Sequence, residues 1–148
     1  MFERSKHIEI RDRTFGEVER QLADRPEVIG VGMEPESDAI IVRMRGLSKP
    51  SIATWIVVRE RSTTFETYVA PAPTVDDPRA LFDFLLRKNT VMTPLAFSIG
   101  AESAIFLVAR VETSRLDAST IDTLLGATYR YSEETFPHIA KLGFGLTG

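Results

Sequence analysis

The 148-residue chain contains no cysteine, so neither disulfide bonds nor thiolate chemistry can contribute to its fold or function. It also lacks a long hydrophobic run, because no stretch approaches the ~18 apolar residues that a membrane-spanning helix requires. Its first residues have no apolar segment of the kind found in signal peptides. These absences lead us to expect a soluble, cytoplasmic protein with no membrane partner.

The chain has no excess of positive charge either. Its 18 basic and 21 acidic residues give a net charge of -3, which offers no electrostatic footprint for nucleic acid. Hydrophobic residues make up 43% and charged residues 26% of the chain, as in ordinary globular proteins. A length of 148 residues suits one domain with a real core. We therefore predict a single domain over residues 1–148 that does not bind nucleic acid.

Few residues are arranged for catalysis. The two histidines, His7 and His138, have no neighbouring ligands at metal-site spacing, so we interpret both as surface or structural residues. Two pairs of adjacent acids, Asp76-Asp77 and Glu133-Glu134, resemble catalytic carboxylates. Neighbours at i and i+1 on a helix diverge, however, and Asp77 is better explained as a helix cap.

Three further motifs resemble functional sites but lack residues or a structural context that those sites require. The acids at positions 34, 36 and 38 alternate as in a calcium loop, but glycine is missing at the sixth position and Arg45 replaces the bidentate acid. Gly30-Val31-Gly32 leads into more strand instead of a helix, so it lacks the context of a phosphate loop. Ser103 has no nucleophile elbow around it. We predict no catalytic residue, no metal and no cofactor.

The pattern of apolar residues and turn signals predicts three helices and six strands. Thr14 and Glu17 form a capping box for the first helix, Asp77-Pro78 opens the second, and Pro137 should kink or re-start the third. Antiparallel hairpins interleaved with helices favour an α+β, two-layer domain in the order α-β-β-β-β-α-β-β-α. The predicted elements are a helix at about 14–24, strands at 28–33, 39–44, 53–60 and 64–69, a helix from 77, strands at 95–99 and 104–111, and a helix from about 117.

Several blocks of the sequence carry a resemblance to a known family, and they are 53–61, 65–73, 85–89, 96–108, 124–128 and 142–144. In this order they resemble the YbjN-domain family, particularly its actinobacterial form. The resemblance covers about residues 40–144, whereas the predicted N-terminal helix and strand at about 14–33 are not covered. It implies a fold similar to that of type III secretion chaperones, which are small homodimers that hold segments of client proteins. YbjN proteins themselves carry only the loose label of sensory transduction regulators.

The central strands carry apolar residues on both faces. Trp55 and Val57 point away from Ile56, and similar oppositions recur on the strands at 64–69 and 104–111. Our hypothesis is that a partner closes the second face, as a homodimer interface or as a groove for an extended client peptide. The alternative is that the first or last helix packs there. The candidate interaction residues are Trp55, Val57, Phe65, Tyr68 and Phe106.

These observations favour a non-catalytic protein-binding module, chaperone-like or adaptor-like, that acts as a homodimer with a protein client. Fold-level analogy is a weak warrant for function, so a second class stays open. The alternative is a small-molecule-sensing regulatory domain with a pocket between helix and sheet, or an enzyme with an unrecognised carboxylate site.

Overall fold

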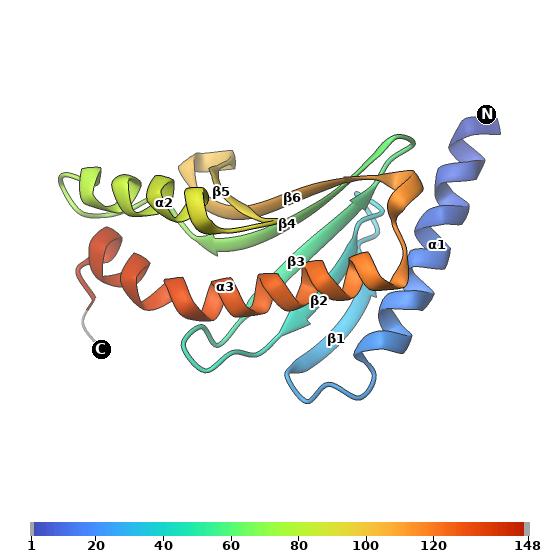
Figure 1. Ribbon diagram of the computed structural model, residues 1–148, viewed down its shortest axis with the longest axis horizontal. Helices are drawn as coiled ribbons and strands as arrows, with labels where there is room; N and C mark the ends of the chain where they lie inside the picture. Colours follow the sequence, from blue (N-terminus) through green and yellow to red (C-terminus); the bar gives the residue numbers. More distant parts are fainter. Residues whose placement is uncertain (1, 147–148) are drawn as a thin grey trace.

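The computed structural model describes residues 2–146, apart from the side chains of residues 2–5 and 7. It confirms the predicted α+β class and the predicted order of elements (Figure 1). Two short 3-10 turns, at Ala101–Ser103 and Thr113–Arg115, flank the last strand. The helices and strands are α1 (Phe2–Leu22), β1 (Val28–Met33), β2 (Ile40–Met44), β3 (Ile52–Val58), β4 (Ser62–Ala70), α2 (Arg79–Val91), β5 (Ala96–Ile99), β6 (Ile105–Glu112) and α3 (Ala118–Phe144).

The six strands form one antiparallel sheet in the order β1-β2-β3-β4-β6-β5. Short connections join β1 to β2, β2 to β3 and β3 to β4, so these four strands form a meander. The chain then leaves the sheet through α2 and returns as β5, which lies at the far edge beyond β6. Edge strands are therefore β1 and β5, and the longest strands, β4 and β6, pair near the centre.

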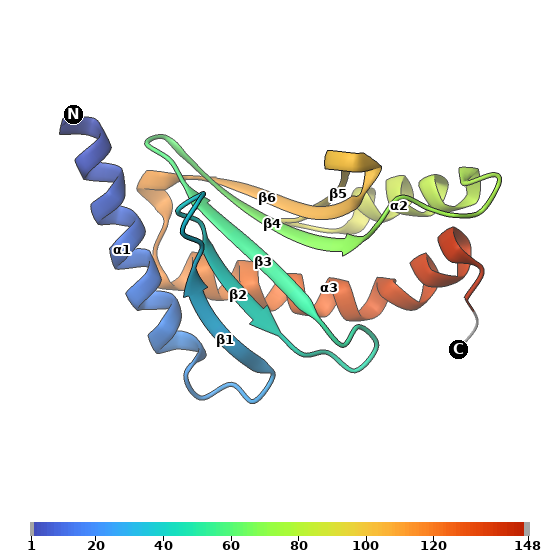
Figure 2. The same ribbon diagram turned by 180° about the vertical axis from the view of Figure 1, so that it is seen from behind.

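All three helices cover the same face of the sheet, which we call the inner face. Figure 1 shows α3 lying across this face, and Figure 2 shows from behind that no helix of residues 2–146 lies over the opposite, outer face. Apolar side chains from alternate positions of the strands meet the helices in one core cluster, which removes them from water. Fully buried members are Ile40, Ile52, Ile56, Phe65, Ile105 and Leu107 from the strands and Val18, Leu81, Ile121, Leu124, Leu125 and Ile139 from the helices.

Buried threonines on the inner face have partners. Thr54 and Thr67 lie opposite each other on β3 and β4, and their hydroxyl oxygens are 2.8 Å apart. The hydroxyls of Thr63 and Thr113 are 3.0 Å apart at the end of the sheet. A buried hydroxyl without a partner would cost free energy, so this pairing explains how polar side chains fit within an otherwise apolar layer.

The predicted start of α1 is wrong. The helix begins at Phe2, and Thr14 lies in its interior, where its hydroxyl donates to the carbonyl oxygen of Ile10 at 2.7 Å. The same hydroxyl that suits a cap can bond to the preceding turn inside a helix, so the sequence signal was ambiguous. The C-terminal end of α1 is held by tertiary contacts, because Gln21 donates to the carbonyl oxygen of Ala118 at 2.6 Å and Arg25, in the turn after the helix, pairs with Asp122.

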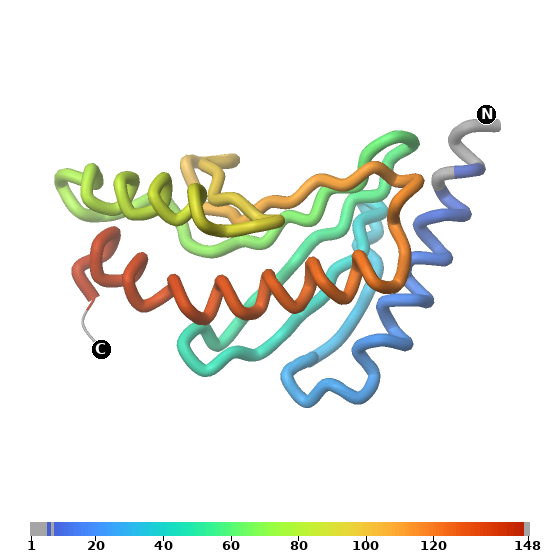
Figure 3. The backbone as a smooth tube through the Cα atoms, in the orientation of Figure 1, coloured from blue at the N-terminus to red at the C-terminus, as the bar shows by residue number. Residues whose placement is uncertain are grey.

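The other helix boundaries follow local chemistry. The last helix was predicted to begin near Asp117, and the structure shows that Asp117 caps α3, because its carboxylate accepts the backbone N–H of Thr120 at 2.8 Å. Helix α2 begins at Arg79, two residues after Asp77, whose carboxylate accepts the Arg79 N–H at 3.1 Å. Hydrogen bonds from Arg79 lower the pKa of Asp77. Helix α3 does not re-start at Pro137 but runs unbroken to Phe144, as the trace in Figure 3 shows.

The β2–β3 hairpin loop is attached to α3 by one carboxylate. Glu133 accepts the backbone N–H groups of Leu47, Ser48 and Lys49 at 2.8, 2.9 and 3.0 Å. A side chain on Gly46 would collide with this carboxylate, so glycine is required there. The ammonium group of Lys49 lies 5.2 Å from the centre of the Phe136 ring, and burial lowers the Lys49 pKa. Glu133 therefore has a structural role, because it holds the loop against α3.

The geometry of Glu133 predicts a pH-dependent contribution to stability. Burial raises the pKa of Glu133, but the N–H groups of Ser48, Lys49 and Leu47 outweigh it and hold the pKa below its ordinary value. A lowered folded-state pKa contributes stability above the unfolded-state pKa, and this contribution is lost as pH falls through the folded-state pKa. We expect Glu133→Gln to lower the free energy of unfolding by about 1 kcal/mol at neutral pH, discounted for exposure to water.

Urea denaturation followed by circular dichroism at pH 7 and pH 3 checks this prediction. The difference between wild type and Glu133→Gln should shrink at the lower pH, because protonation removes the charge in the wild-type protein too. Glu134→Gln is the matched control, since Glu134 is exposed and adjacent in sequence. An equal effect of the two substitutions, or a difference that does not change with pH, would contradict this account.

Candidate functional site

The outer face of the sheet is built from cross-strand rows of side chains. Its two long rows run across all six strands, and each combines apolar residues with a charged one. Side chains directly opposite on neighbouring strands lie within contact distance, so each row forms a continuous strip. The first row is Gly32, Ile41, Trp55, Glu66, Val108 and Ala96, and the second is Gly30, Arg43, Ala53, Tyr68, Phe106 and Ser98.

Four of the five predicted interaction residues lie on this outer face. Trp55, Val57 and Phe106 are half-buried, and Tyr68 is 37% exposed. Tyr68 and Phe106 are cross-strand partners whose rings pack edge to face, with centroids 5.7 Å apart. The structure therefore brings an aromatic pair together on β4 and β6, with Trp55 on the neighbouring strand β3.

Phe65 is a correction to the predicted set. Its side chain points to the inner face and is 0% exposed, within the core beneath the helices. It lies opposite Ile56, which is equally buried. A side chain with no exposed surface cannot contact a partner in this conformation, so Phe65 stabilises the sheet and is not part of an interaction surface.

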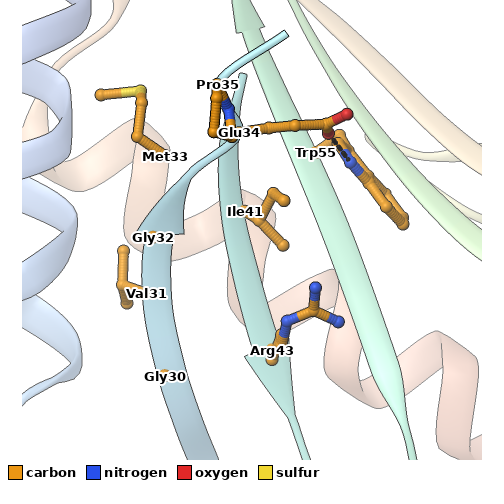
Figure 4. Close-up of a pocket in the computed structure, with 9 residues that line it drawn as sticks. All are labelled: Gly30, Val31, Gly32, Met33, Glu34, Pro35, Ile41, Arg43 and Trp55. Atoms are coloured by element: carbon orange, nitrogen blue, oxygen red, sulfur yellow. Dashed lines mark hydrogen bonds between the residues drawn. The ribbon is translucent and has the colours of Figure 1, made fainter. Parts of the chain in front are cut away.

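Trp55 is fixed in place by a hydrogen bond to Glu34. Its indole N–H donates to the Glu34 carboxylate at 2.7 Å, across the end of β2 (Figure 4). The two residues form one wall of a shallow depression with a volume of about 600 Å³. Val31 and Met33 point away from Trp55 toward α1, whereas Ile41 and Arg43 lie between β1 and Trp55 (Figure 4). The depression thus belongs to the outer face.

Glycine forms the floor of this depression. Gly30 and Gly32 are strand residues on the outer face, and an added Cβ at either position would meet no other atom within 4 Å. The motif is thus part of strand β1, as the sequence indicated, with a register shift between Val28 and Gly30. Open space above two backbone positions leaves room for groups from another molecule.

Sequence reasoning missed the charged members of this surface. Arg43 was not selected, and Glu34 was treated as a turn residue. Arg43 forms no hydrogen bond or ion pair with any residue that the structure describes, and Glu66 and Arg110 on the same face likewise lack an ion pair there. The signal that could have found Arg43 is its position as the charged residue in an otherwise apolar strand, Ile40–Met44.

The remaining sequence candidates are scattered. His138 is exposed, and its ring lies 5.3 Å from that of Phe84, while the side chain of His7 lies outside the described residues. The acids of the calcium-like turn diverge, because Glu34 binds Trp55 and Asp38 pairs with Arg11 at 3.3 Å. Within the described part of the chain, no three His, Cys, Asp or Glu side chains are placed to hold a metal ion.

A second apolar surface lies between α2 and β5. The exposed side chains of Leu86 and Ile99, at 68% and 50%, border a groove of about 300 Å³ that Phe82 and Leu85 also line. The amide of Asn89 crosses the groove to β5, accepting the backbone N–H of Phe97 at 2.7 Å and donating to its carbonyl oxygen at 3.2 Å. Asn89 thus satisfies backbone groups that an edge strand would otherwise present.

The Trp55–Glu34 bond predicts a spectroscopic effect. Trp55 is the single tryptophan of the chain, so tryptophan fluorescence, excited selectively over that of the tyrosines, reports on this site alone. We expect Glu34→Ala to free the indole, shift its emission to longer wavelength and increase quenching by acrylamide. The matched control is Glu36→Ala, which changes an exposed acid in the same turn. An unchanged emission spectrum in Glu34→Ala would show that the bond does not hold the ring in solution.

Comparison with known sequences identifies relatives without an established function. No family model matches the chain. The chain is 32% identical over 107 residues to uncharacterized protein Rv0487 of Mycobacterium tuberculosis (strain ATCC 25618 / H37Rv), which covers 72% of this chain and 57% of that protein. Uncharacterized protein ML2442 of Mycobacterium leprae is 24% identical over 105 residues, covering 71% and 56%. The chain therefore spans little more than half the length of these relatives.

Solved structures show what the fold resembles. One similar chain occurs in the ExsC–ExsE complex, with a TM-score of 0.59, and the match covers 88% of this chain and 92% of that chain. Another occurs in the complex of the Yersinia pestis type III secretion chaperone SycH with a fragment of YscM2. Its TM-score is 0.54, and the match covers 82% of this chain and 96% of that chain. A third occurs in the heterodimeric ExoU–SpcU complex of Pseudomonas aeruginosa, with a TM-score of 0.50 over 83% and 94%. Each is 12% identical to this chain. The protein thus has an α+β fold similar to that of type III secretion chaperones.

Proposed function

We propose that this protein is a non-catalytic protein-binding module, chaperone-like or adaptor-like, related to the YbjN-domain family. It holds a protein client on the outer face of its sheet and acts as a homodimer. The observation that carries the proposal is the outer face itself, where Trp55, Tyr68 and Phe106 lie on three neighbouring strands and no helix in the described part of the chain covers them.

The composition of the outer face suits a protein partner. Aromatic side chains supply large contact areas at low entropic cost and dominate the energetics of many interfaces. On this surface they lie beside charged groups, Arg43, Glu66 and Arg110, which provide the polar surroundings typical of an interface that also exists in water. The outer face is therefore polar enough to remain soluble alone and apolar enough to gain from burial.

The structural neighbours support the same function. The similar structures are complexes with named protein partners, namely ExsE, a fragment of YscM2, and ExoU. At 12% identity the likeness concerns the fold, so the partners of those proteins cannot be transferred. We propose only that this chain also binds a protein partner, and that it does so with its sheet.

A non-catalytic role is supported by the structural roles of the acids. Glu133, Asp117 and Asp77 accept backbone N–H groups at loops or helix starts, and Glu34 accepts the Trp55 indole. General acid–base catalysis requires titratable groups that converge on one substrate atom. These acids instead lie at separate places in the fold and maintain its local structure.

The groove between α2 and β5 supports the homodimer. Leu86 and Ile99 are large apolar residues left exposed side by side, away from the outer face. Because Asn89 occupies the outward backbone groups of Phe97, a second copy should pack by side chains and should not extend the sheet at β5. Assigning the second copy to α2 and β5 leaves the outer face available for a client.

The first test concerns the client. We expect affinity capture with the wild-type protein to recover a reproducible protein partner, and Trp55→Ala to reduce its recovery at least tenfold, because loss of a central aromatic anchor costs ~2 kcal/mol or more. Leu47→Ala is the matched control, since Leu47 is 96% exposed on the hairpin loop away from this face. Equal recovery with Trp55→Ala and with a Tyr68→Ala, Phe106→Ala double variant would reject the outer face as the binding surface.

The second test concerns the dimer. We expect the wild-type protein to sediment as a dimer and Leu86→Glu to sediment as a monomer with an unchanged circular dichroism spectrum, because an unpaired carboxylate is costly to bury in an interface. Leu47→Glu introduces the same charge at another exposed leucine and should leave the dimer intact. A monomeric wild-type protein, or a dimer that survives Leu86→Glu, would contradict this assignment.

A further inference from the structure

We propose that the depression over β1, β2 and β3 selects an extended client segment in which an apolar residue and an acidic residue are separated by one residue. This inference rests on the proposed function, because it takes the outer face to be the client-binding surface. It follows from two adjacent subsites, one apolar and one cationic, within the same depression.

The apolar subsite lies over Gly32. Gly32 is opposite Ile41, which in turn is opposite Trp55, so an open floor is bordered by an aliphatic and an aromatic side chain. The hydrogen bond from Trp55 to Glu34 holds the ring as a fixed wall. A wall that is ordered before binding loses little entropy when an apolar side chain enters.

The cationic subsite lies over Gly30, which is opposite Arg43. The Arg43 side chain is exposed and has no hydrogen bond or ion pair among the described residues. Its guanidinium can therefore offer paired N–H donors to an incoming carboxylate, the group that fits its planar geometry best. Ala53, its neighbour on β3, leaves space beside it.

The spacing of the two subsites sets the spacing in the client. Gly30 and Gly32 are two residues apart on one strand, which corresponds to about 7 Å. Side chains at positions i and i+2 of an extended peptide point the same way and are separated by the same distance. A peptide lying along β1 can therefore place an apolar side chain over Gly32 and a carboxylate beside Arg43 at once.

The two ends of this depression carry opposite charges, Glu34 at one end and Arg43 at the other. Glu34 lies two residues beyond Gly32, and Glu66 lies on the far side of Trp55. An acidic client residue at the Glu34 end would meet a like charge, whereas one at the Arg43 end meets the opposite charge. Repulsion at one end and attraction at the other together favour a single direction of binding.

Selection from random peptides displayed on phage tests this inference with the full chain immobilised. Peptides enriched on the wild-type protein should contain an acidic residue two positions from a large apolar residue. Peptides enriched on Arg43→Glu should contain a basic residue at that position. Binding of one enriched peptide, measured by fluorescence anisotropy, should weaken about tenfold with Arg43→Gln and should weaken further as salt is added.

Trp55→Ala separates this inference from the proposed function. If enriched peptides require Trp55 but show no acidic preference, or the same preference on wild type and Arg43→Glu, the inference is overturned and the outer face still binds clients. If no peptide is enriched on wild type over Trp55→Ala, both the inference and the outer-face proposal fail. Arg43 and Trp55 lie on the exposed side of the sheet, and circular dichroism confirms that each variant is folded before selection.

Discussion

Burial of one face of the sheet by all three helices is the constraint on which the rest of this structure depends. Apolar side chains of the helices and alternate residues of β2 to β6 form one buried cluster. On β1 the residues are only partly buried, and Val31 and Met33 pack against the edge of this cluster. Because strand side chains alternate, placing Ile56 in that cluster necessarily places Trp55 and Val57 on the other side. The exposed apolar character of the outer face is thus a direct consequence of how the core is closed.

This one-sided arrangement separates the residues that stabilise the fold from those available for binding. Phe65 and Tyr68 come from the same strand, but the first is enclosed among apolar neighbours and the second reaches water. The two sheet edges differ as well. At β5 the amide of Asn89 occupies the outward backbone groups of Phe97, whereas β1 has two glycines that leave its outer side open. The groove between α2 and β5 and the depression over β1 therefore lie at opposite ends of the sheet.

Local signals predicted the strands and the last helix because those elements are set by nearby residues. The hairpins agree with their predicted positions to within about two residues, and α3 begins at Ala118, close to its predicted start near residue 117. The beginning of α1 could not be predicted in this way. Thr14 and Glu17 match a capping box, yet the helix continues through them and is held by contacts with β3 and α3, which are distant in sequence.

The sequence by itself determined which residues are apolar, which are charged, and that the central strands have two apolar faces. Only the tertiary structure decided which face the helices cover. Side chains alternate along a strand, so the sequence shows that there are two faces, but it does not show which of them is buried. For the same reason the tertiary structure alone placed Phe65 in the core, brought Glu34 to the Trp55 indole, and set Arg43 beside an open glycine floor. Those relations join different strands, and strand pairing is a property of the folded sheet and not of any local segment.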